Sequence, residues 1–180
     1  MRLRAALAVL LLAATLTACT SKEDGCDTSS AGTVECPAGK RPAAPQLSGE
    51  LLEGGRYDLS QDRGQVVVIN FWGSWCAPCR AEIDDLEQVY LSTKDQGVRF
   101  LGINVRDDRD KAKAFHQGKV TYPSVIDPSS KLALDFDVPP NTIPATIVLD
   151  REGRIAVVIR VAVQAAEFEP VVARVAAEAS

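Results

Sequence analysis

The feature that most constrains the fold is an apolar strand pattern that leads directly into two closely spaced cysteines. Residues 66–71 read Val-Val-Val-Ile-Asn-Phe, which is typical of a strand buried on both faces. Cys76 and Cys79 follow, separated by an Ala-Pro pair, and apolar residues then recur at helical spacing until residues 96–97, Gln-Gly. The sequence therefore predicts a central sheet with both cysteines where a strand turns into a helix.

Strand and helix patterns alternate along the rest of the chain, so βαβ units and an α/β fold are expected. Its 180 residues suffice for one domain with appendages. The remaining predicted elements are an N-terminal hairpin over 47–52 and 56–59, a strand over 98–104, a helix over 108–117, a short strand around 125–126, a hairpin over 145–149 and 155–161, and a helix over 167–177.

The position of the two cysteines predicts redox chemistry. A thiolate at a helix N-terminus is stabilised by unpaired backbone amides and by the helix dipole, which lowers the thiol pKa below its free value of about 8.5. Cys76 is therefore the predicted nucleophile and Cys79, one turn later, the resolving thiol. Pro78 suits the first helical turn, where a missing N–H costs nothing.

Composition narrows the alternatives. The net charge is −4 and no block of basic residues is present, so nucleic acid is not an expected partner. A structural zinc site at Cys76 and Cys79 would need two more ligands from Cys26, Cys36 and His116, none at a suitable spacing. We therefore expect neither a metal site nor a cofactor. His116, in a charged helical stretch, is expected to face solvent.

The N-terminus has the pattern of an export signal. Arg2 and Arg4 precede an apolar run over 5–16, which is too short to span a bilayer, where about 17 to 25 residues are needed. Residues 16–19, Leu-Thr-Ala-Cys, resemble a bacterial lipobox, so we expect a lipoprotein signal peptide over 1–18 and a lipid on Cys19. The alternative is an ordinary signal peptide with an incidental cysteine.

Composition divides the chain after the predicted signal peptide into two parts. Residues 19–45 are polar, small and without strand or helix periodicity, which predicts a lipid anchor followed by a flexible linker, and residues 46–180 form the folded domain. Cys26 and Cys36 lie in this linker. A structural disulfide is the favoured interpretation in an oxidising compartment, and exchange with the downstream cysteines or an unformed pair are the alternatives.

The segment around the two cysteines resembles that of a known family. Residues 71–82, Phe-Trp-Gly-Ser-Trp-Cys-Ala-Pro-Cys-Arg-Ala-Glu, resemble the active-site segment of thioredoxin-like proteins, and in particular of the TlpA/ResA-type membrane-tethered thiol-disulfide oxidoreductases. The resemblance runs from about residue 45 to the C-terminus and implies a thioredoxin-like fold, with a central mixed sheet flanked by helices. It also implies that Ile143 and Pro144 form the cis-proline loop that lies against the cysteines.

The same resemblance assigns roles to residues around the cysteines. Asn70 stands where thioredoxin has a buried aspartate, and Glu82 matches a glutamate that tunes acid-base behaviour at the active site. The alternative for Glu82 is a first-turn residue that only favours the helix dipole. Asp84 replaces a helix-kinking proline that relatives often carry. Trp72 is expected in the core.

A shallow groove for an extended polypeptide is expected beside Cys76. Trp75, Ile143 and Pro78 are its predicted lining, and the Tyr-Pro pair at 122–123 could add apolar surface. Packing of these residues in the core is the alternative. The expected partners are cysteine-containing exported proteins and a membrane electron donor or acceptor.

The resulting prediction is a lipid-anchored enzyme on the extracytoplasmic face of a bacterial membrane. It would reduce disulfides of exported proteins, as TlpA/ResA-type proteins do in cytochrome c maturation. Introduction of disulfides is the alternative, because the Cys-Ala-Pro-Cys sequence does not fix the direction. A thiol peroxidase is less favoured, since Gly73 stands where such enzymes place a threonine.

Overall fold

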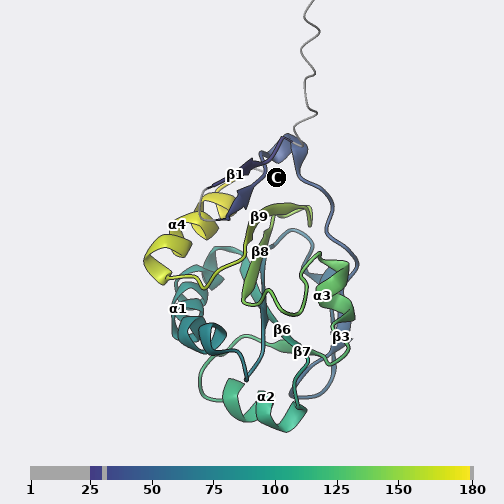
Figure 1. Cartoon of the computed structure of the whole chain (residues 1–180). Coiled ribbons are helices and arrows are strands. Elements are labelled where there is room, and N and C mark those ends of the chain that lie inside the picture. The colour runs from purple at the N-terminus through teal and green to yellow at the C-terminus, as the bar shows by residue number, and fades with distance from the viewer. Residues whose placement is uncertain (1–24, 30–31, 179–180) are drawn as a thin grey trace, which may run out of the picture.

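The computed structural model describes residues 25–29 and 32–178, which form a seven-stranded mixed sheet with helices on both faces (Figure 1). The strand order is β1-β2-β9-β8-β5-β6-β7. The strands of this sheet are β1 (Asp27–Thr28), β2 (Val34–Glu35), β5 (Val66–Trp72), β6 (Val98–Val105), β7 (Ser124–Asp127), β8 (Ala145–Leu149) and β9 (Ile155–Ile159). The helices are α1 (Ala77–Thr93), α2 (Arg109–His116), α3 (Lys131–Asp135) and α4 (Ala165–Ala176). This arrangement confirms the predicted α/β, thioredoxin-like fold.

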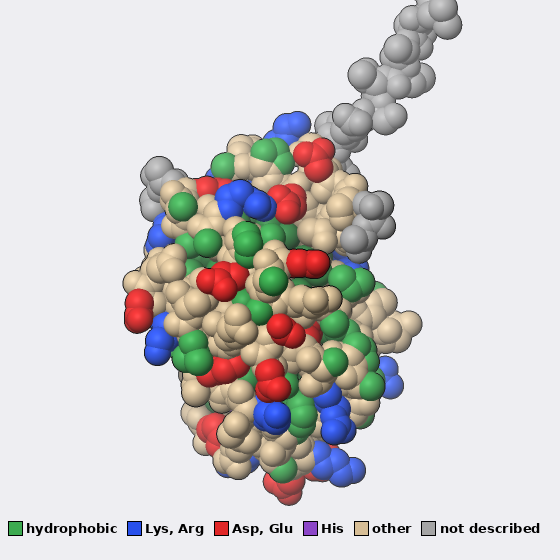
Figure 2. Space-filling view, turned by 90° about the vertical axis from the view of Figure 1, so that its left-hand side faces the viewer, with side chains coloured by type: hydrophobic (Ala, Val, Ile, Leu, Met, Phe, Trp, Pro, Cys, Tyr) green, Lys and Arg blue, Asp and Glu red, His purple; other side chains and the backbone are tan. Residues whose placement is uncertain are grey.

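The central strand β5 organises both layers of the core. It pairs in parallel with β6 and antiparallel with β8, and all seven of its residues are buried. Val66 and Val68 face the apolar cluster under α1 and α4, whereas Val67, Ile69 and Phe71 face the cluster under α3. Helices α1 and α4 therefore cover one face and α3 the other (Figure 1). On the outer side of α1 and α4, acidic, basic and apolar side chains are mixed (Figure 2).

Helix α1 begins and ends where the sequence predicts. Cys76 is its N-cap residue and Pro78 lies in the first turn. A 3-10 turn over Lys94–Gln96 follows the helix, and Gly97 then adopts a left-handed conformation with φ 79° that ends it. Asp84 lies within this continuous helix.

The predicted hairpins are also confirmed. Strands β3 (Ser48–Glu50) and β4 (Arg56–Asp58) pair antiparallel as a separate two-stranded sheet. Strands β8 and β9 pair antiparallel around the turn at residues 150–153.

The predicted flexible linker is wrong for the described part of residues 19–45. Strand β2 pairs with β1 and also adds antiparallel to β9, so it extends the main sheet. The Cys26–Cys36 disulfide closes this hairpin. Arg41 then fixes the segment to the domain, because its buried guanidinium binds Asp150 and the carboxylate of Glu178. The sequence does not reveal this order, because two-residue strands are too short to show a strand periodicity. An arginine that is buried in ion pairs also cannot be distinguished in the sequence from one that faces solvent.

His116 is not exposed, contrary to prediction. Its imidazole is 6% exposed and stacks on Trp72 with 5.7 Å between ring centroids. It also lies edge-on to Tyr122, which packs in the core beside Phe100 and does not line the predicted groove. Burial lowers the pKa of His116, so the neutral ring is favoured. Half of the residues of α2 are charged, so its sequence does not indicate that His116 lies on the side of the helix that faces the core.

Candidate active site

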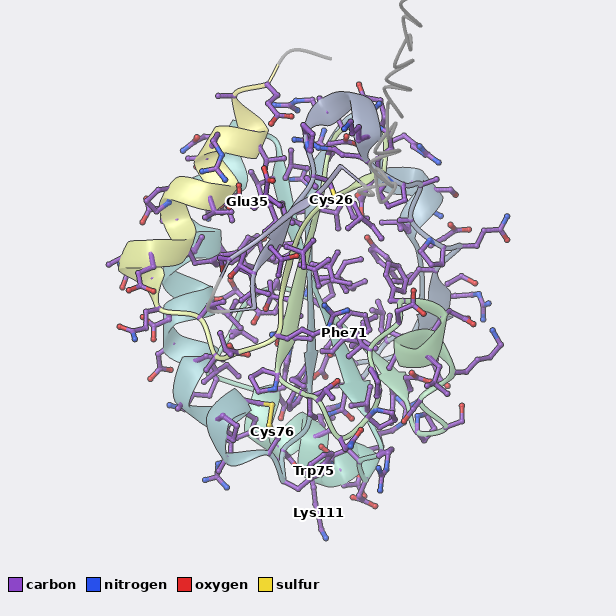
Figure 3. All side chains as sticks on the ribbon, turned by 45° about the horizontal axis from the view of Figure 1, so that its top comes forward. Cys26, Glu35, Phe71, Trp75, Cys76 and Lys111 are labelled. Atoms are coloured by element: carbon purple, nitrogen blue, oxygen red, sulfur yellow. A yellow bond between two sulfur atoms is a disulfide. The ribbon has the colours of Figure 1, made fainter. Side chains whose placement is uncertain are left out.

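The junction between β5 and α1 places Cys76 and Cys79 together as a disulfide (Figure 3). The backbone N–H of Cys79 lies 3.3 Å from the sulfur of Cys76, so an unpaired amide of the first helical turn points at that sulfur. Cys76 is 5% exposed and Cys79 is 2% exposed. Cys76 is thus the slightly more exposed residue of the pair, and it lies at the helix N-terminus, where a thiolate is favoured.

The loop that contains Ile143 and Pro144 lies against Cys76. The Ile143–Pro144 peptide bond is cis, and β8 begins with the next residue, Ala145. Ala145 is the β8 partner of Phe71 near the end of β5, which brings the loop to the cysteines. The sulfur of Cys76 lies 3.8 Å from the carbonyl oxygen of Ile143. The structure thus brings Cys76, Cys79, Ile143 and Pro144 together, as the sequence predicts.

Glu82 lies one helical turn beyond Cys79 and is 1% exposed. Its Oε1 accepts a hydrogen bond from Nδ2 of Asn70 at 2.9 Å, and its Oε2 accepts one from the backbone N–H of Val163 at 2.8 Å. Burial raises the pKa of Glu82 to about 7, despite the lowering effect of both hydrogen bonds. Glu82 is therefore not a surface residue that merely favours the helix dipole.

An apolar cluster lies beneath the disulfide. It joins Cys76 and Cys79 to Trp72, Leu52 and Ala112. The indole of Trp72 also donates a hydrogen bond to the hydroxyl of Ser124 at 3.0 Å. Trp72 is thus a core residue, as predicted.

Trp75 and Pro78 border the cysteines from outside. Trp75 is 51% exposed, and Pro78 is exposed on α1. Trp75 lies beside Cys76 at the same end of the molecule (Figure 3). These two residues and Ile143 provide the apolar surface that was predicted next to Cys76.

Sequence reasoning missed Asp107. Its carboxylate accepts hydrogen bonds from the backbone N–H and the hydroxyl of Ser74, two residues before Cys76. The available signal was its position just after the end of β6, where parallel strands direct their following loops toward the end of β5.

The second disulfide, Cys26–Cys36, lies at the opposite end of the molecule from Cys76 (Figure 3). It forms as predicted and is remote from the active-site pair. Cys19 and the predicted signal peptide over 1–18 lie outside the described residues. Within residues 25–29 and 32–178, no three His, Cys, Asp or Glu side chains form a group that could hold a metal ion. No helix in this part of the chain is long and apolar enough to cross a membrane.

Comparisons with known proteins agree with this geometry. Residues 41–158 match the AhpC/TSA family. The chain is 33% identical over 117 residues to the thiol-disulfide oxidoreductase ResA of Geobacillus kaustophilus, covering 64% of this chain and 66% of ResA. It is 35% identical over 120 residues to the thiol:disulfide interchange protein HelX of Rhodobacter capsulatus, covering 66% of this chain and 65% of HelX. The matched region thus spans slightly less than two thirds of these relatives.

Two solved structures resemble the whole domain. A secreted thiol-disulfide isomerase from Corynebacterium glutamicum superposes with a TM-score of 0.77 at 36% identity, over 81% of this chain and 92% of that one. A DsbF homologue from Corynebacterium diphtheriae gives a TM-score of 0.75 at 36% identity, over 79% and 92% of the two chains.

Proposed function

Because this chain belongs to the AhpC/TSA family of thioredoxin-like proteins, we propose that it is a thiol-disulfide oxidoreductase that acts on cysteine-containing exported proteins. The observation that carries the proposal is the Cys76–Cys79 pair at the N-terminus of α1, with the sulfur of Cys76 against the carbonyl that precedes the cis Pro144. Relatives named for thiol-disulfide exchange support it.

In the reductive direction the reaction starts from the dithiol. The thiolate of Cys76 attacks one sulfur of a substrate disulfide, that S–S bond breaks, and the leaving thiolate takes up a proton. Cys79 then loses its proton and attacks the sulfur of Cys76, which breaks the mixed disulfide and releases the second substrate thiol. Two electrons pass to the substrate, and the protein is left with the Cys76–Cys79 disulfide. A dithiol donor must reduce that disulfide before the next cycle.

Glu82 is proposed to handle the proton of Cys79. It lies one turn beyond Cys79 on the same helix, it is buried, and a pKa of about 7 lets it accept and return a proton near neutrality. Asn70 and Val163 hold its two oxygens in place.

Reduction is the proposed direction. A dithiol-disulfide pair is strongly oxidising when its reduced, dithiol form is stabilised. Here Ala and Pro separate the cysteines, so no cationic side chain lies between them to stabilise a thiolate. The buried ionisable group one turn beyond Cys79 is the acid Glu82, whose negative charge would disfavour a thiolate at Cys79. The helix N-terminus still favours the thiolate of Cys76 alone. The potential of the pair tests the direction: a value near about −270 mV supports a reductase, and one near about −120 mV supports disulfide introduction.

A peroxidase is disfavoured by packing. A Cβ added at Gly73 would lie 2.7 Å from Nε1 of Trp75 and 2.8 Å from its Cε2, so the indole occupies the space that a threonine would need. Peroxide consumption by the reduced protein that matches its rate with protein disulfides would reverse this conclusion.

We also propose that Cys19 carries a lipid and tethers the protein to the extracytoplasmic face of the membrane, where a membrane electron donor would recharge it. The apolar run over 5–16, followed by Leu-Thr-Ala-Cys, supports this. Apocytochrome c is the substrate that the resemblance to TlpA/ResA-type proteins favours. Wild type in the membrane fraction and Cys19→Ser in the soluble fraction would support the tether, and equal fractionation would contradict it.

A further inference from the structure

The turn after β6 holds the active-site loop from the side. The Oδ2 of Asp107 accepts the backbone N–H of Ser74 at 2.6 Å, and its Oδ1 accepts the hydroxyl of Ser74 at 2.9 Å. The side chain of Asn104, at the end of β6, donates to Oδ2 of Asp107 at 2.9 Å and thereby anchors the carboxylate to the sheet. One carboxylate thus ties the residue before Trp75 to the central sheet.

Trp75 is tied to the same turn by a second contact. Its indole Nε1 donates a hydrogen bond to the backbone carbonyl of Arg106 at 3.1 Å. Arg106 adopts a left-handed conformation with φ 50°, which is unusual for a residue with a side chain. The same edge of the indole faces Gly73, where a built Cβ would lie 2.7 Å from Nε1 and 2.8 Å from Cε2. Trp75 is therefore exposed but fixed in orientation.

A fixed exposed aromatic ring is an effective contact for a polypeptide. Ordering a side chain on binding costs conformational entropy, and a ring that is already held avoids much of that cost. Trp75 is next to Cys76 in sequence and lies beside it, so a polypeptide whose disulfide reaches Cys76 has the indole within reach. A small disulfide can reach the same sulfur with little of this contact.

We propose that Asp107 is a positioning residue that holds Trp75 as a platform for polypeptide substrates, and so sets the preference for protein over small-molecule disulfides. This inference rests on the proposed function, because it assigns a substrate-binding role at the same site. Asp107 acts through Ser74 and the 106–107 turn and takes no part in the exchange itself.

The test compares Asp107→Asn with Asp108→Asn. Both variants remove one negative charge from the same turn. Asp108 caps α2 by accepting the backbone N–H groups of Asp110 and Lys111, and asparagine is an equally good cap. Asp107→Asn leaves one acceptor oxygen where the carboxylate offers two, so Ser74 loses part of its anchor. Steady-state kinetics are measured with insulin and with glutathione disulfide, using dithiothreitol as the electron donor.

For Asp107→Asn we expect the KM for insulin to rise by up to about tenfold, the cost of ordering on binding one side chain that is no longer held in advance. The kcat for insulin and the rate with glutathione disulfide should stay within about twofold of wild type, as should every value for Asp108→Asn. An unchanged insulin KM in Asp107→Asn would overturn the proposal. An equal loss with both substrates would overturn it too, since it would place the effect on the cysteines or the fold.

A double-mutant cycle identifies Trp75 as the group that Asp107 positions. In a Trp75→Ala background, Asp107→Asn should change the insulin KM by no more than about twofold, because the platform is already absent. A full tenfold effect in that background contradicts the proposal. Ser74→Ala, which removes only the hydroxyl contact with Asp107, should give a smaller rise in the insulin KM. This variant tests the same contact if Asp107→Asn does not fold.

A fluorescence measurement separates this proposal from the proposed function. Trp72 is buried, so acrylamide quenching reports mainly on Trp75. Asp107→Asn should increase the quenching and lower the residual anisotropy of Trp75, and Asp108→Asn should not. If wild type reduces neither disulfide, the proposed function fails while this readout still decides whether Asp107 holds Trp75. Unchanged quenching and anisotropy in Asp107→Asn would show that Asp107 does not position Trp75, even in an active enzyme.

Discussion

Asn70 donates a hydrogen bond from Nδ2 to Oε1 of Glu82 at 2.9 Å inside the core. Glu82 lies one helical turn beyond Cys79. Asn70 belongs to the central strand and Glu82 to the helix that carries both cysteines, so this contact joins the two elements that form the active site. Asn70 cannot itself exchange a proton in the physiological range. The acid-base behaviour of the buried pair is therefore that of Glu82.

The first prediction concerns the pH profile of exchange. Because the pKa of Glu82 is raised to about 7, it changes from a neutral acid to a proton acceptor as the pH rises through that value. We expect the second step, attack by Cys79, to accelerate through about pH 7 in wild type, and Glu82→Gln to lose this inflection. Stopped-flow release of a thiol substrate between pH 5.5 and pH 8.5 measures it. An identical profile in both proteins would exclude Glu82 from proton handling.

The second prediction concerns stability. The folded-state pKa of Glu82 lies above its ordinary value of 4.5, so the unfolded state releases this proton first as the pH rises. The stability that the protonated Glu82 contributes to the fold is complete below about pH 4.5, declines as the pH rises and is lost above about pH 7. Its upper bound is about 3 kcal/mol. Urea unfolding at pH 5 and pH 8 should show wild type losing more stability than Glu82→Gln over this interval, and parallel losses would contradict the assignment.

The third prediction separates the roles of the two active-site cysteines. Cys76→Ser should abolish insulin reduction, because the sulfur at the helix N-terminus, where a thiolate is favoured, is removed. Cys79→Ser should still attack but should accumulate a mixed disulfide with its substrate, since no resolving thiol remains. Non-reducing electrophoresis and mass spectrometry distinguish these outcomes. Mixed disulfide accumulating on Cys76→Ser instead would reverse the assigned order.

The fourth prediction concerns the remote disulfide. Replacing Cys26 and Cys36 together by serine should lower the free energy of unfolding by about 2 to 3 kcal/mol, the value expected for a loop of this length. Exchange at Cys76 should stay within about twofold of wild type, because the two disulfides lie at opposite ends of the molecule. Denaturant unfolding and insulin reduction provide the two readouts. A large loss of exchange activity in a folded variant would show that the two pairs communicate.

Much of the site was predictable because its residues carry local signals. Cys76, Cys79 and Pro78 sit where a buried strand pattern turns into a helical one, and the structure places them there. Glu82 and Pro144 needed the family resemblance, since neither burial of a helix glutamate nor a cis peptide bond follows from a short sequence pattern.

The features that the sequence did not predict share one cause. The segment that contains β1 and β2 is ordered through contacts with partners more than a hundred residues away, such as those between Arg41 and Asp150. His116 is buried because Trp72 and Tyr122 approach it from other elements, and nothing in its own helix shows this. Asp107 was missed because its role depends on Ser74, across the sheet end. Such residues are defined by tertiary contacts, which a local pattern does not contain.

The pairing of β2 with β9 has a consequence for the behaviour of this protein at high concentration. Strand β9 reads Ile-Ala-Val-Val-Ile, an apolar β-branched segment with the composition of an aggregation-prone edge. Strand β2 pairs with two of its residues, Val157 and Val158, and so occupies part of the hydrogen-bonding edge that another chain could use. Proteolytic loss of the segment before residue 46 would leave the redox centre intact but would open this edge, so the truncated domain should self-associate where the full chain stays dispersed.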